Sequence, residues 1–291
     1  MHFPISGVVC PIWLPPAIAF LVALLATPAG VSGAFLLLPF QMSVLGFVSP
    51  AVTPTNLIYN VVSVPGGVAR YMKERRMIWP MAWTITVGTL PGVFLGVEIR
   101  VRYLADPRYC KFFVGCVLLY LGARLFLDAG HPRRTMRVQD GAHVKSVIVS
   151  SRRMAFEFQG ASYSFRPATL AAVALLVGLI GGIYGVGGGA MIAPFLMTIL
   201  GLPAYAVAGA ALVGTLVTSI AGVVVFEFLG GAANSGVRPD WALGLLFGIG
   251  GLCGSYCGAL LQKRLPERAI RLLLALLVTG MALNYTIRFF V

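Results

Sequence analysis

The chain repeats part of itself. Shifted by 155 positions, residues 30–72 align with residues 185–227 without a gap, and 14 of these 43 pairs are identical. The shared motif reads G-V-x-G-x(5)-P-F-x-M-x-x-L-G, and it starts at Gly30 in the first half and at Gly185 in the second. A duplicated apolar unit with a glycine break is typical of transport proteins that are built from two repeats in the membrane.

The composition indicates a chain that lies in a membrane. Hydrophobic residues make up 58% of the 291 residues and charged residues 11%, whereas soluble domains carry about 25% charged residues. The net charge of +13 comes from Lys and Arg between the apolar runs, which is the pattern of cytoplasmic loops rather than of a nucleic-acid-binding module. We predict an all-α polytopic integral membrane protein whose partner is the lipid bilayer and not nucleic acid. The first 20 residues contain no Lys or Arg, so we expect no cleavable signal peptide.

Each half contains five apolar segments. They cover residues 14–27, 34–47, 56–69, 77–97 and 109–127 in the first half, and 168–184, 190–202, 205–228, 241–261 and 269–291 in the second. The second segment of each half is too short for a bilayer core of about 30 Å, and glycines separate it from the first segment. We therefore predict a glycine-broken helix pair in each half, either re-entrant or spanning, followed by three spanning helices. Such irregular backbone is tolerated at membrane depth only where it is buried or lines a cavity.

The polar stretch between the halves sets the domain boundaries. We predict a first transmembrane repeat at 1–130, a polar linker at 131–167 and a second repeat at 168–291. If each half crosses the membrane an odd number of times, the repeats are inverted and 16 of the 22 Lys and Arg residues lie on one side. Counting each broken pair as one span would divide them 14 to 8.

The positive-inside rule favours the inverted arrangement. It predicts a cell inner (plasma) membrane protein with a cytoplasmic linker and with both termini periplasmic or extracellular. Strand-like runs at 147–149 and 154–158, followed by Gly160 at a turn, predict a small β-hairpin in the linker. This hairpin is either a regulatory or docking element or part of a basic tether.

The glycine motifs resemble the sulfite exporter TauE/SafE family of membrane transport proteins. Gly185-Val-Gly-Gly-Gly-Ala-Met-Ile-Ala-Pro194 fits the pattern of that family closely, and Gly30-Val-Ser-Gly-Ala-Phe-Leu-Leu-Leu-Pro39 fits it with Ser32 and Ala34 in place of glycines. The likeness covers nearly the whole chain except the linker, and it includes the small-residue pairs Gly92/Gly96 and Gly254/Gly258. The resemblance implies export of sulfite or small organosulfonates, and it implies a transporter rather than an enzyme.

The chemistry of the glycine breaks favours an anion. A helix that begins after a glycine turn exposes unpaired backbone N–H groups and the positive end of its dipole, and glycine lets an oxyanion approach these groups. We expect the two breaks to converge near the midplane around one small anion, with alternating access. Alternatively, the glycines serve only close helix packing, which is the interpretation that we favour for Gly92/Gly96 and Gly254/Gly258.

Polar residues of the third segments complete the candidate site. Asn56, Asn60 and Ser63 share one helix face, and intramembrane Asn is costly unless it is satisfied. These side chains either bind the anion or link the helices. The candidate substrate-binding residues are Ser32, Gly33, Asn56, Asn60, Ser63, Gly187, Gly188, Gly189, Thr215, Thr218 and Ser219. Weaker candidates are Tyr59, Tyr184 and Gln41.

Other functions are open at this stage. Gly30-Val31-Ser32-Gly33 is a G-x-S-G, as in intramembrane serine proteases, but the required general base is missing because His2, His131 and His143 lie outside the apolar segments. A carrier or channel for another small solute and a structural membrane protein are further alternatives. Among the few acids near segment ends, Glu227 is the best candidate for proton coupling. We expect no metal or cofactor, because Cys253 and Cys257 lack further ligands nearby.

Overall fold

Helices make up most of the computed structural model. It describes residues 1–47, 49–102, nine positions between 112 and 127, 144–150, 152–158, 160–184, 186–232 and 238–290. The first half contains α1 (Leu14–Ala26), the 3₁₀ turn η1 (Thr27–Ala29), α2 (Ala34–Ser43), α3 (Val52–Lys73) and α4 (Trp79–Arg102). The second half contains α6 (Pro167–Tyr184), the 3₁₀ turn η2 (Gly188–Met191), α7 (Ile192–Ile199), α8 (Ala204–Ala232), α9 (Trp241–Leu261) and α10 (Glu267–Phe290). The apolar segment expected at 109–127 falls largely outside the described residues, as does Gly185.

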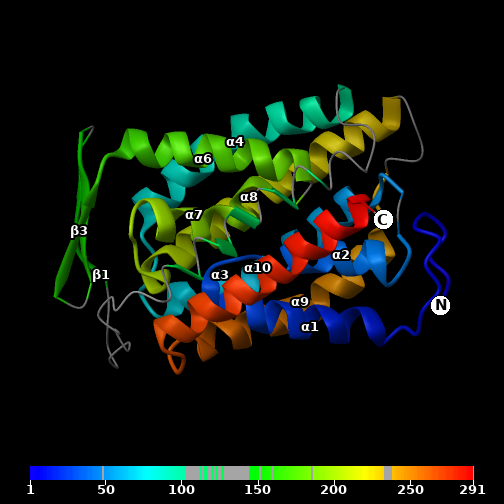
Figure 1. The fold of residues 1–291 in the computed structure, drawn as a ribbon, viewed down its shortest axis with the longest axis horizontal. Helices are drawn as coiled ribbons and strands as arrows, with labels where there is room; N and C mark the ends of the chain where they lie inside the picture. The colour runs from blue at the N-terminus through cyan, green and yellow to red at the C-terminus, as the bar shows by residue number, and fades with distance from the viewer. Residues whose placement is uncertain are drawn as a thin grey trace.

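A broken helix pair opens each half. In the first half, α1 passes through η1 and Gly30, whose φ is 72°, before the chain turns back into α2 (Figure 1). In the second half, α6 is followed by Gly187, whose φ is 87°, then by η2 and α7. Glycine adopts such positive φ angles without steric cost. The α-helical part of the second break begins at Ile192, two residues later than predicted, because Gly188 and Gly189 form a 3₁₀ turn.

Four helices of the described chain are long and apolar enough to cross a membrane, namely α4, α6, α8 and α9. Helix α3 has 22 residues and begins at Val52, four residues before the predicted segment. It does not join this group because Asn56, Asn60 and other polar residues lower its hydropathy. Large apolar side chains such as Val87 (67% exposed) and Leu176 (59%) cover the outer surface, which is the surface expected of a helical protein in lipid.

The helices of the two halves interlock. The fourth helix of each half contacts the first and third helices of the other half: α4 contacts α6 and α8, and α9 contacts α1 and α3. A Cβ atom at Gly92 would lie 2.3 Å from the Leu175 carbonyl oxygen, and one at Gly254 would lie 2.3 Å from the Phe20 carbonyl oxygen. Carbonyl oxygens of α6 and α1 also lie within 3.0 Å of a Cβ atom at Gly96 (2.3 Å) and at Gly258 (2.8 Å). These glycines therefore serve close helix packing, as predicted.

A reciprocal contact joins α3 and α8 at the centre of the bundle. A Cβ atom at Gly222 would lie 2.7 Å from Leu57 Cδ1, and one at Gly67 would lie 2.8 Å from Leu212 Cδ1. Leu57 and Leu212 are identical positions of the sequence repeat, and so are Gly67 and Gly222. A leucine of α3 therefore packs on a glycine of α8, and the equivalent leucine of α8 packs on the equivalent glycine of α3.

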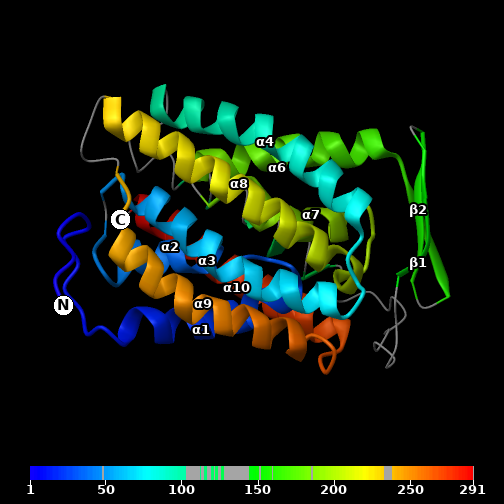
Figure 2. The same ribbon diagram turned by 180° about the vertical axis from the view of Figure 1, so that it is seen from behind.

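A small sheet lies at one end of the bundle, and both chain termini lie at the other end (Figures 1 and 2). It contains β1 (Val144–Val149), β2 (Met154–Phe158) and β3 (Ala161–Phe165), antiparallel and in the order β1-β2-β3. Phe156 stacks on Tyr163 with ring centroids 5.3 Å apart. The linker segment for which a hairpin was predicted thus contains three strands. We call this end of the molecule the sheet end and the opposite end the termini end.

Equivalent helices of the two halves run in opposite directions between these ends. Helices α1, α3 and α9 run toward the sheet end, whereas α4, α6, α8 and α10 run away from it (Figures 1 and 2). The pairs α1 and α6, α3 and α8, and α4 and α9 therefore each run in opposite directions along the bundle.

Candidate functional site

Asn60 of α3 connects the two glycine breaks. Its Nδ2 donates hydrogen bonds to the Val186 carbonyl oxygen at 3.0 Å and to Ser219 Oγ at 3.1 Å. Its Oδ1 accepts a hydrogen bond from Ser32 Oγ. Asn60, Ser32 and Ser219 are all buried. One amide side chain therefore joins the first break, the second break and helix α8. We call Asn60, Ser32, Val186 and Ser219 the Asn60 network.

The first break presents unpaired donors beside this network. Ser32 Oγ accepts a hydrogen bond from the Ala34 N–H at 3.2 Å at the start of α2. Among the described residues, no hydrogen bond engages the N–H groups of Ser32 and Gly33. A Cβ atom at Gly33 would lie 2.1 Å from the Tyr59 hydroxyl oxygen, so a larger residue fits here only if the Tyr59 hydroxyl moves or is removed. Helix starts with free N–H groups are a common place for anions to bind in proteins.

The second break lies directly on α8. A Cβ atom at Gly189 would lie 2.1 Å from the Thr215 backbone nitrogen, so this contact also requires glycine. The Gly189 N–H donates to Thr218 Oγ1 at 3.5 Å, the outer limit of a hydrogen bond. The hydroxyls of Thr215 and Thr218 donate to carbonyl oxygens one turn back in α8, at 2.9 and 2.8 Å. Thr218 therefore faces the break, whereas the hydrogen bond of Thr215 stays within its own helix.

A Cβ atom at Gly187 would lie 3.1 Å from Ser219 Oγ, so Gly187 borders the Asn60 network. Gly188 lies elsewhere, because its nearest neighbours are Gly178 of α6 and Val93 and Thr89 of α4. The structure thus brings Gly187 and Gly189 close to the polar residues of α8 and directs Gly188 toward helix packing.

The other polar residues of α3 bond away from the Asn60 network. Asn56 Nδ2 donates to the Ala34 carbonyl oxygen at 3.0 Å, and Asn56 Oδ1 accepts from Gln41 Nε2 at 3.3 Å. These bonds tie α3 to α2. The Ser63 carbonyl oxygen accepts a hydrogen bond from Ser255 Oγ at 2.6 Å, which ties α3 to α9. Both residues are predicted site residues, but their hydrogen bonds link helices.

Two buried polar atoms beside these contacts have no partner within the described part of the chain. They are Gln41 Oε1 and the Tyr59 hydroxyl. Both side chains are fully buried, and an unpaired buried polar atom costs about 1–3 kcal/mol. Each atom is therefore a place where a polar ligand would gain a hydrogen bond. Sequence considerations placed both residues only among the weaker candidates.

The Asn60 network contains no ionisable group. Glu227 and Glu98 are exposed on α8 and α4, which removes Glu227 as a buried proton acceptor, and Asp128 lies outside the described residues. The Ser32 hydroxyl donates to an amide oxygen rather than to a general base, so it is not activated as a nucleophile. His2 forms a strand bridge with Val9 near the chain start, and His131 and His143 lie outside the described residues.

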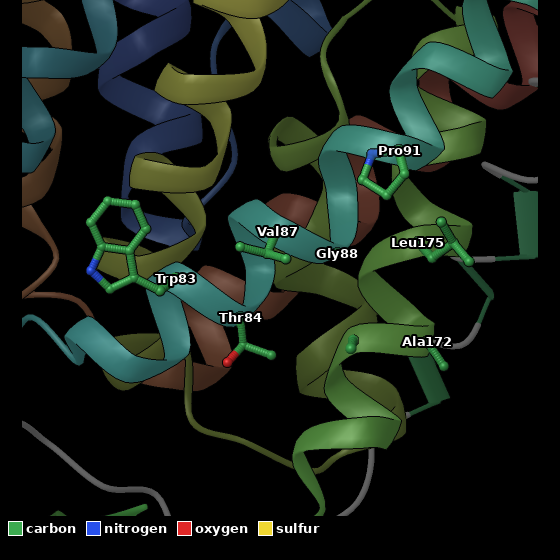
Figure 3. Close-up of a pocket in the computed structure, with 8 residues that line it drawn as sticks. Trp83, Thr84, Val87, Gly88, Pro91, Ala172 and Leu175 are labelled. Carbon is green, nitrogen blue, oxygen red and sulfur yellow. The ribbon is translucent and has the colours of Figure 1, made fainter. Parts of the chain in front are cut away.

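A groove of about 600 Å³ lies on the outer face between α4 and α6 (Figure 3). It is lined mainly by apolar and small side chains: Trp83, Thr84, Val87, Gly88, Pro91, Ala171, Ala172 and Leu175. Trp83 (59% exposed) and Val87 face outward. This groove lies on the outer surface and its lining residues offer an anion no charged partner, so the buried Asn60 network is the better candidate site.

The fold and this site define a polytopic membrane protein with a buried, uncharged polar centre between two broken helix pairs. The profile of the family described as Sulfite exporter TauE/SafE matches residues 16–285. The chain therefore belongs to this family, whose members are membrane transporters and not enzymes.

One relative is the "Probable membrane transporter protein YunE" of Bacillus subtilis (strain 168). The two chains are 24% identical over 181 residues, which is 60% of this chain and 63% of the relative. The chain thus matches less than two thirds of the length of that relative. No solved structure matches the chain.

Proposed function

We propose that the chain is a membrane transporter that exports small sulfur-containing anions, such as sulfite or organosulfonates. The anion binds near the midplane between the two glycine breaks. The observation that carries this proposal is the position of Asn60, whose amide bonds Ser32 in one break and Val186 in the other. Asn60 therefore contacts both breaks at once, as a residue of a substrate site between two moving halves must do.

The donors around Asn60 match a small oxyanion. Within the described part of the chain the N–H groups of Ser32 and Gly33 have no acceptor, and the hydroxyls of Ser32, Ser219 and Thr218 rotate to suit a ligand. The positive end of the α2 dipole adds to the attraction. A cation would find few free acceptors here, because the Val186 carbonyl oxygen already accepts from Asn60. In our proposal the anion accepts hydrogen bonds from these donors, and it replaces Asn60 only as the acceptor of the Ser32 hydroxyl.

The transport cycle that we propose uses two inverted repeats. The opposite directions of equivalent helices and the reciprocal Leu57–Gly222 and Leu212–Gly67 contacts support a pseudo-two-fold axis between α3 and α8. Equivalent backbone hydrogen bonds in the two halves support it too. The bond from Val31 N to Ala26 O recurs 155 positions later as the bond from Val186 N to Gly181 O. In the same way, the bond from Phe47 N to Gln41 O recurs as the bond from Leu202 N to Leu196 O. Alternating access then arises from rocking of the two halves around a fixed central site.

The membrane orientation follows from charge. We propose that the sheet end is cytoplasmic and that the termini end is periplasmic or extracellular, because the Lys- and Arg-rich loops belong to the sheet end. In a bacterial cell this places the chain in the inner membrane. Exported anions then enter at the sheet end and leave at the termini end.

The test is transport by the purified chain in lipid vesicles. We expect wild-type protein to move ³⁵S-labelled sulfite, and Asn60→Ala to lower the initial rate by about tenfold or more, since it removes three hydrogen bonds at the site. Thr84→Ala is the matched control, because the Thr84 hydroxyl bonds only the Pro80 carbonyl oxygen of its own helix. Wild-type rates from Asn60→Ala would reject the site. Transport of an unrelated solute with no response to sulfite or sulfonates would reject the substrate class.

A further inference from the structure

Three cations share one carboxylate at the sheet end. Glu74, just after the end of α3, accepts from Arg70 Nε at 2.7 Å, Arg76 Nη1 at 2.8 Å and Lys263 Nζ at 3.2 Å. We call Arg70, Arg76 and Lys263 the cation cluster. Glu74 balances only one of its three charges, so the group carries two surplus positive charges. Such a surplus attracts anions from the adjacent solution.

Arg76 is the buried member of this cluster. Its side chain is 1% exposed, and its guanidinium Cζ lies 5.1 Å from the centroid of the Tyr71 ring and 5.9 Å from that of Tyr205. Nη1 and Nη2 are bonded to Glu74 and Gln262, but Nε has no partner within the described residues. A buried guanidinium is stable only when its charge and its donors are satisfied. The Arg76 Nε is therefore a buried donor without an acceptor among the described residues.

The backbone that presents Arg76 is strained. Arg75 has φ of 52°, the only positive φ at a non-glycine residue of the described chain. The Arg76 N–H bonds back to the Tyr71 carbonyl oxygen at 3.1 Å, and the Arg75 N–H bonds to the Met72 carbonyl oxygen at 2.9 Å. This is a helix end of the kind that normally uses glycine at the left-handed position. The tight turn directs Arg76 inward, toward Gln262 of the α9–α10 connection.

The cation cluster is tied to the first glycine break. Gln262, which binds Arg76, donates from Nε2 to the Pro28 carbonyl oxygen at 2.6 Å. The Tyr71 hydroxyl donates to the Thr27 carbonyl oxygen at 3.2 Å. Both acceptors belong to η1, which leads through Gly30 to Ser32. Hydrogen bonds through Gln262 therefore link Arg76 to the turn that leads to Ser32 of the Asn60 network.

We propose that the cation cluster is a second anion-binding site, at the sheet-end mouth, and that Glu74 occupies it as an internal substitute ligand. Its ligand is a small oxyanion with sulfate-like or sulfonate-like geometry, since two arginines and a lysine together match several acceptor oxygens. The incoming anion takes the donors of Arg70, Arg76 and Lys263, and Glu74 moves away. The loss of the Arg76–Glu74 contact then frees the strained turn and the Gln262–Pro28 link. Only the identity of the transported anion rests on the function proposed above.

Calorimetric titration of the full chain in detergent tests this site, with sodium sulfate as the probe and sodium chloride at equal ionic strength as the blank. We expect Glu74→Gln to tighten sulfate binding about tenfold, because it removes a charged competitor for three donors. Lys263→Gln, at a side chain 34% exposed, is expected to weaken binding about fivefold without loss of folding. Lys73→Gln is the matched control, because it removes one positive charge from an exposed residue outside the cluster.

The outcomes separate this proposal from the central site. Sulfate binding that is equal in Glu74→Gln and wild type, or that falls as much in Lys73→Gln as in Lys263→Gln, would overturn the cluster. If Glu74→Gln does not fold, the Lys263→Gln and Lys73→Gln comparison still decides. Asn60→Ala is expected to keep full sulfate binding at the cluster while losing transport. Loss of transport with intact binding therefore supports both sites, whereas intact transport in Asn60→Ala rejects only the central one.

Discussion

Leu57 of α3 packs its Cδ1 atom against Gly222 of α8, and the pair 155 positions along, Leu212 and Gly67, makes the same contact in reverse. A contact that two segments make with each other through identical residues is isologous, as at a two-fold dimer interface. Here both partners belong to one chain. The packing of α3 on α8 is therefore the place where a symmetric movement of the two halves would have its axis.

Alanine at these two glycines is expected to destabilise the protein to a similar extent. Gly222→Ala and Gly67→Ala each push a Cβ atom against a leucine methyl group, at a cost of about 1 kcal/mol. The measurement is the thermal unfolding midpoint in detergent. Gly280→Ala on α10, where no atom lies within 4 Å of the added Cβ, is the control and is expected to be neutral or stabilising.

A double substitution identifies the source of this cost. Leu57→Val removes the methyl groups that meet Gly222, so Leu57→Val with Gly222→Ala is expected to lose less stability than the sum of the single changes. If the two losses of stability are additive, the contact with Leu57 is not the reason why glycine is needed at position 222.

Tyr59→Phe is expected to raise stability by about 1 kcal/mol, because it removes a buried hydroxyl that has no partner among the described residues. It is also expected to rescue Gly33→Ala, since the added Cβ would meet this hydroxyl oxygen at 2.1 Å. Alone, Gly33→Ala is expected to cost about 2–3 kcal/mol. Thermal unfolding of the three variants gives the coupling energy.

The same variants report on substrate binding. If Tyr59→Phe leaves stability unchanged but weakens sulfite transport, the hydroxyl contacts the anion. If Tyr59→Phe raises stability and leaves transport unchanged, the hydroxyl is an unpaired buried group that does not contact the anion.

Arg75→Gly is expected to stabilise the turn after α3. Arg75 has φ of 52°, and a left-handed conformation costs a residue with a side chain about 1–2 kcal/mol, which glycine avoids. Part of this gain is lost because glycine is more flexible in the unfolded chain. We expect a net gain of about 1 kcal/mol in thermal unfolding. Arg75→Ala keeps the strain while removing the same charge, and an equal gain from it would point to charge rather than to backbone geometry.

Cysteine accessibility tests the membrane orientation. In a chain whose five native cysteines are replaced, we introduce a single cysteine at Val9, which is 73% exposed at the termini end, or at Ser162, which is exposed on β3. A membrane-impermeant maleimide is expected to label Val9→Cys in intact cells. Ser162→Cys is expected to react only after permeabilisation. Labelling of both positions from the same side would contradict the inverted arrangement.

Much of the candidate site was predictable because its parts leave local signals. The glycine breaks interrupt apolar runs at Gly30 and Gly187, and the polar face of α3 follows from the spacing of Asn56, Asn60 and Ser63. The element bounds were less predictable. Helix α3 begins at Val52 rather than at Asn56, because Thr and Pro residues reduce the apolar signal without preventing a helix in its first turn.

Two residues of the cation cluster, Arg76 and Lys263, escaped prediction. Arg70 and Arg76 appear in the sequence as loop charges that obey the positive-inside rule, and nothing local distinguishes the buried Arg76 from the exposed Arg75. The one available signal was Glu74, the single acid in the segment 70–76, which also contains four basic residues. Its significance depends on the approach of Lys263 and Gln262, which are far away in the sequence.

The sequence by itself determined the membrane class, the duplication and the positions of the breaks, because hydropathy, repeat spacing and glycine content are properties of short segments. Only the tertiary structure decided that Asn60, and not its neighbours on the same face, joins both breaks. Asn56, Asn60 and Ser63 are equivalent by helical spacing, but each meets a different partner: α2, the second break and α9. Those partners are set by long-range helix packing, which no local pattern encodes.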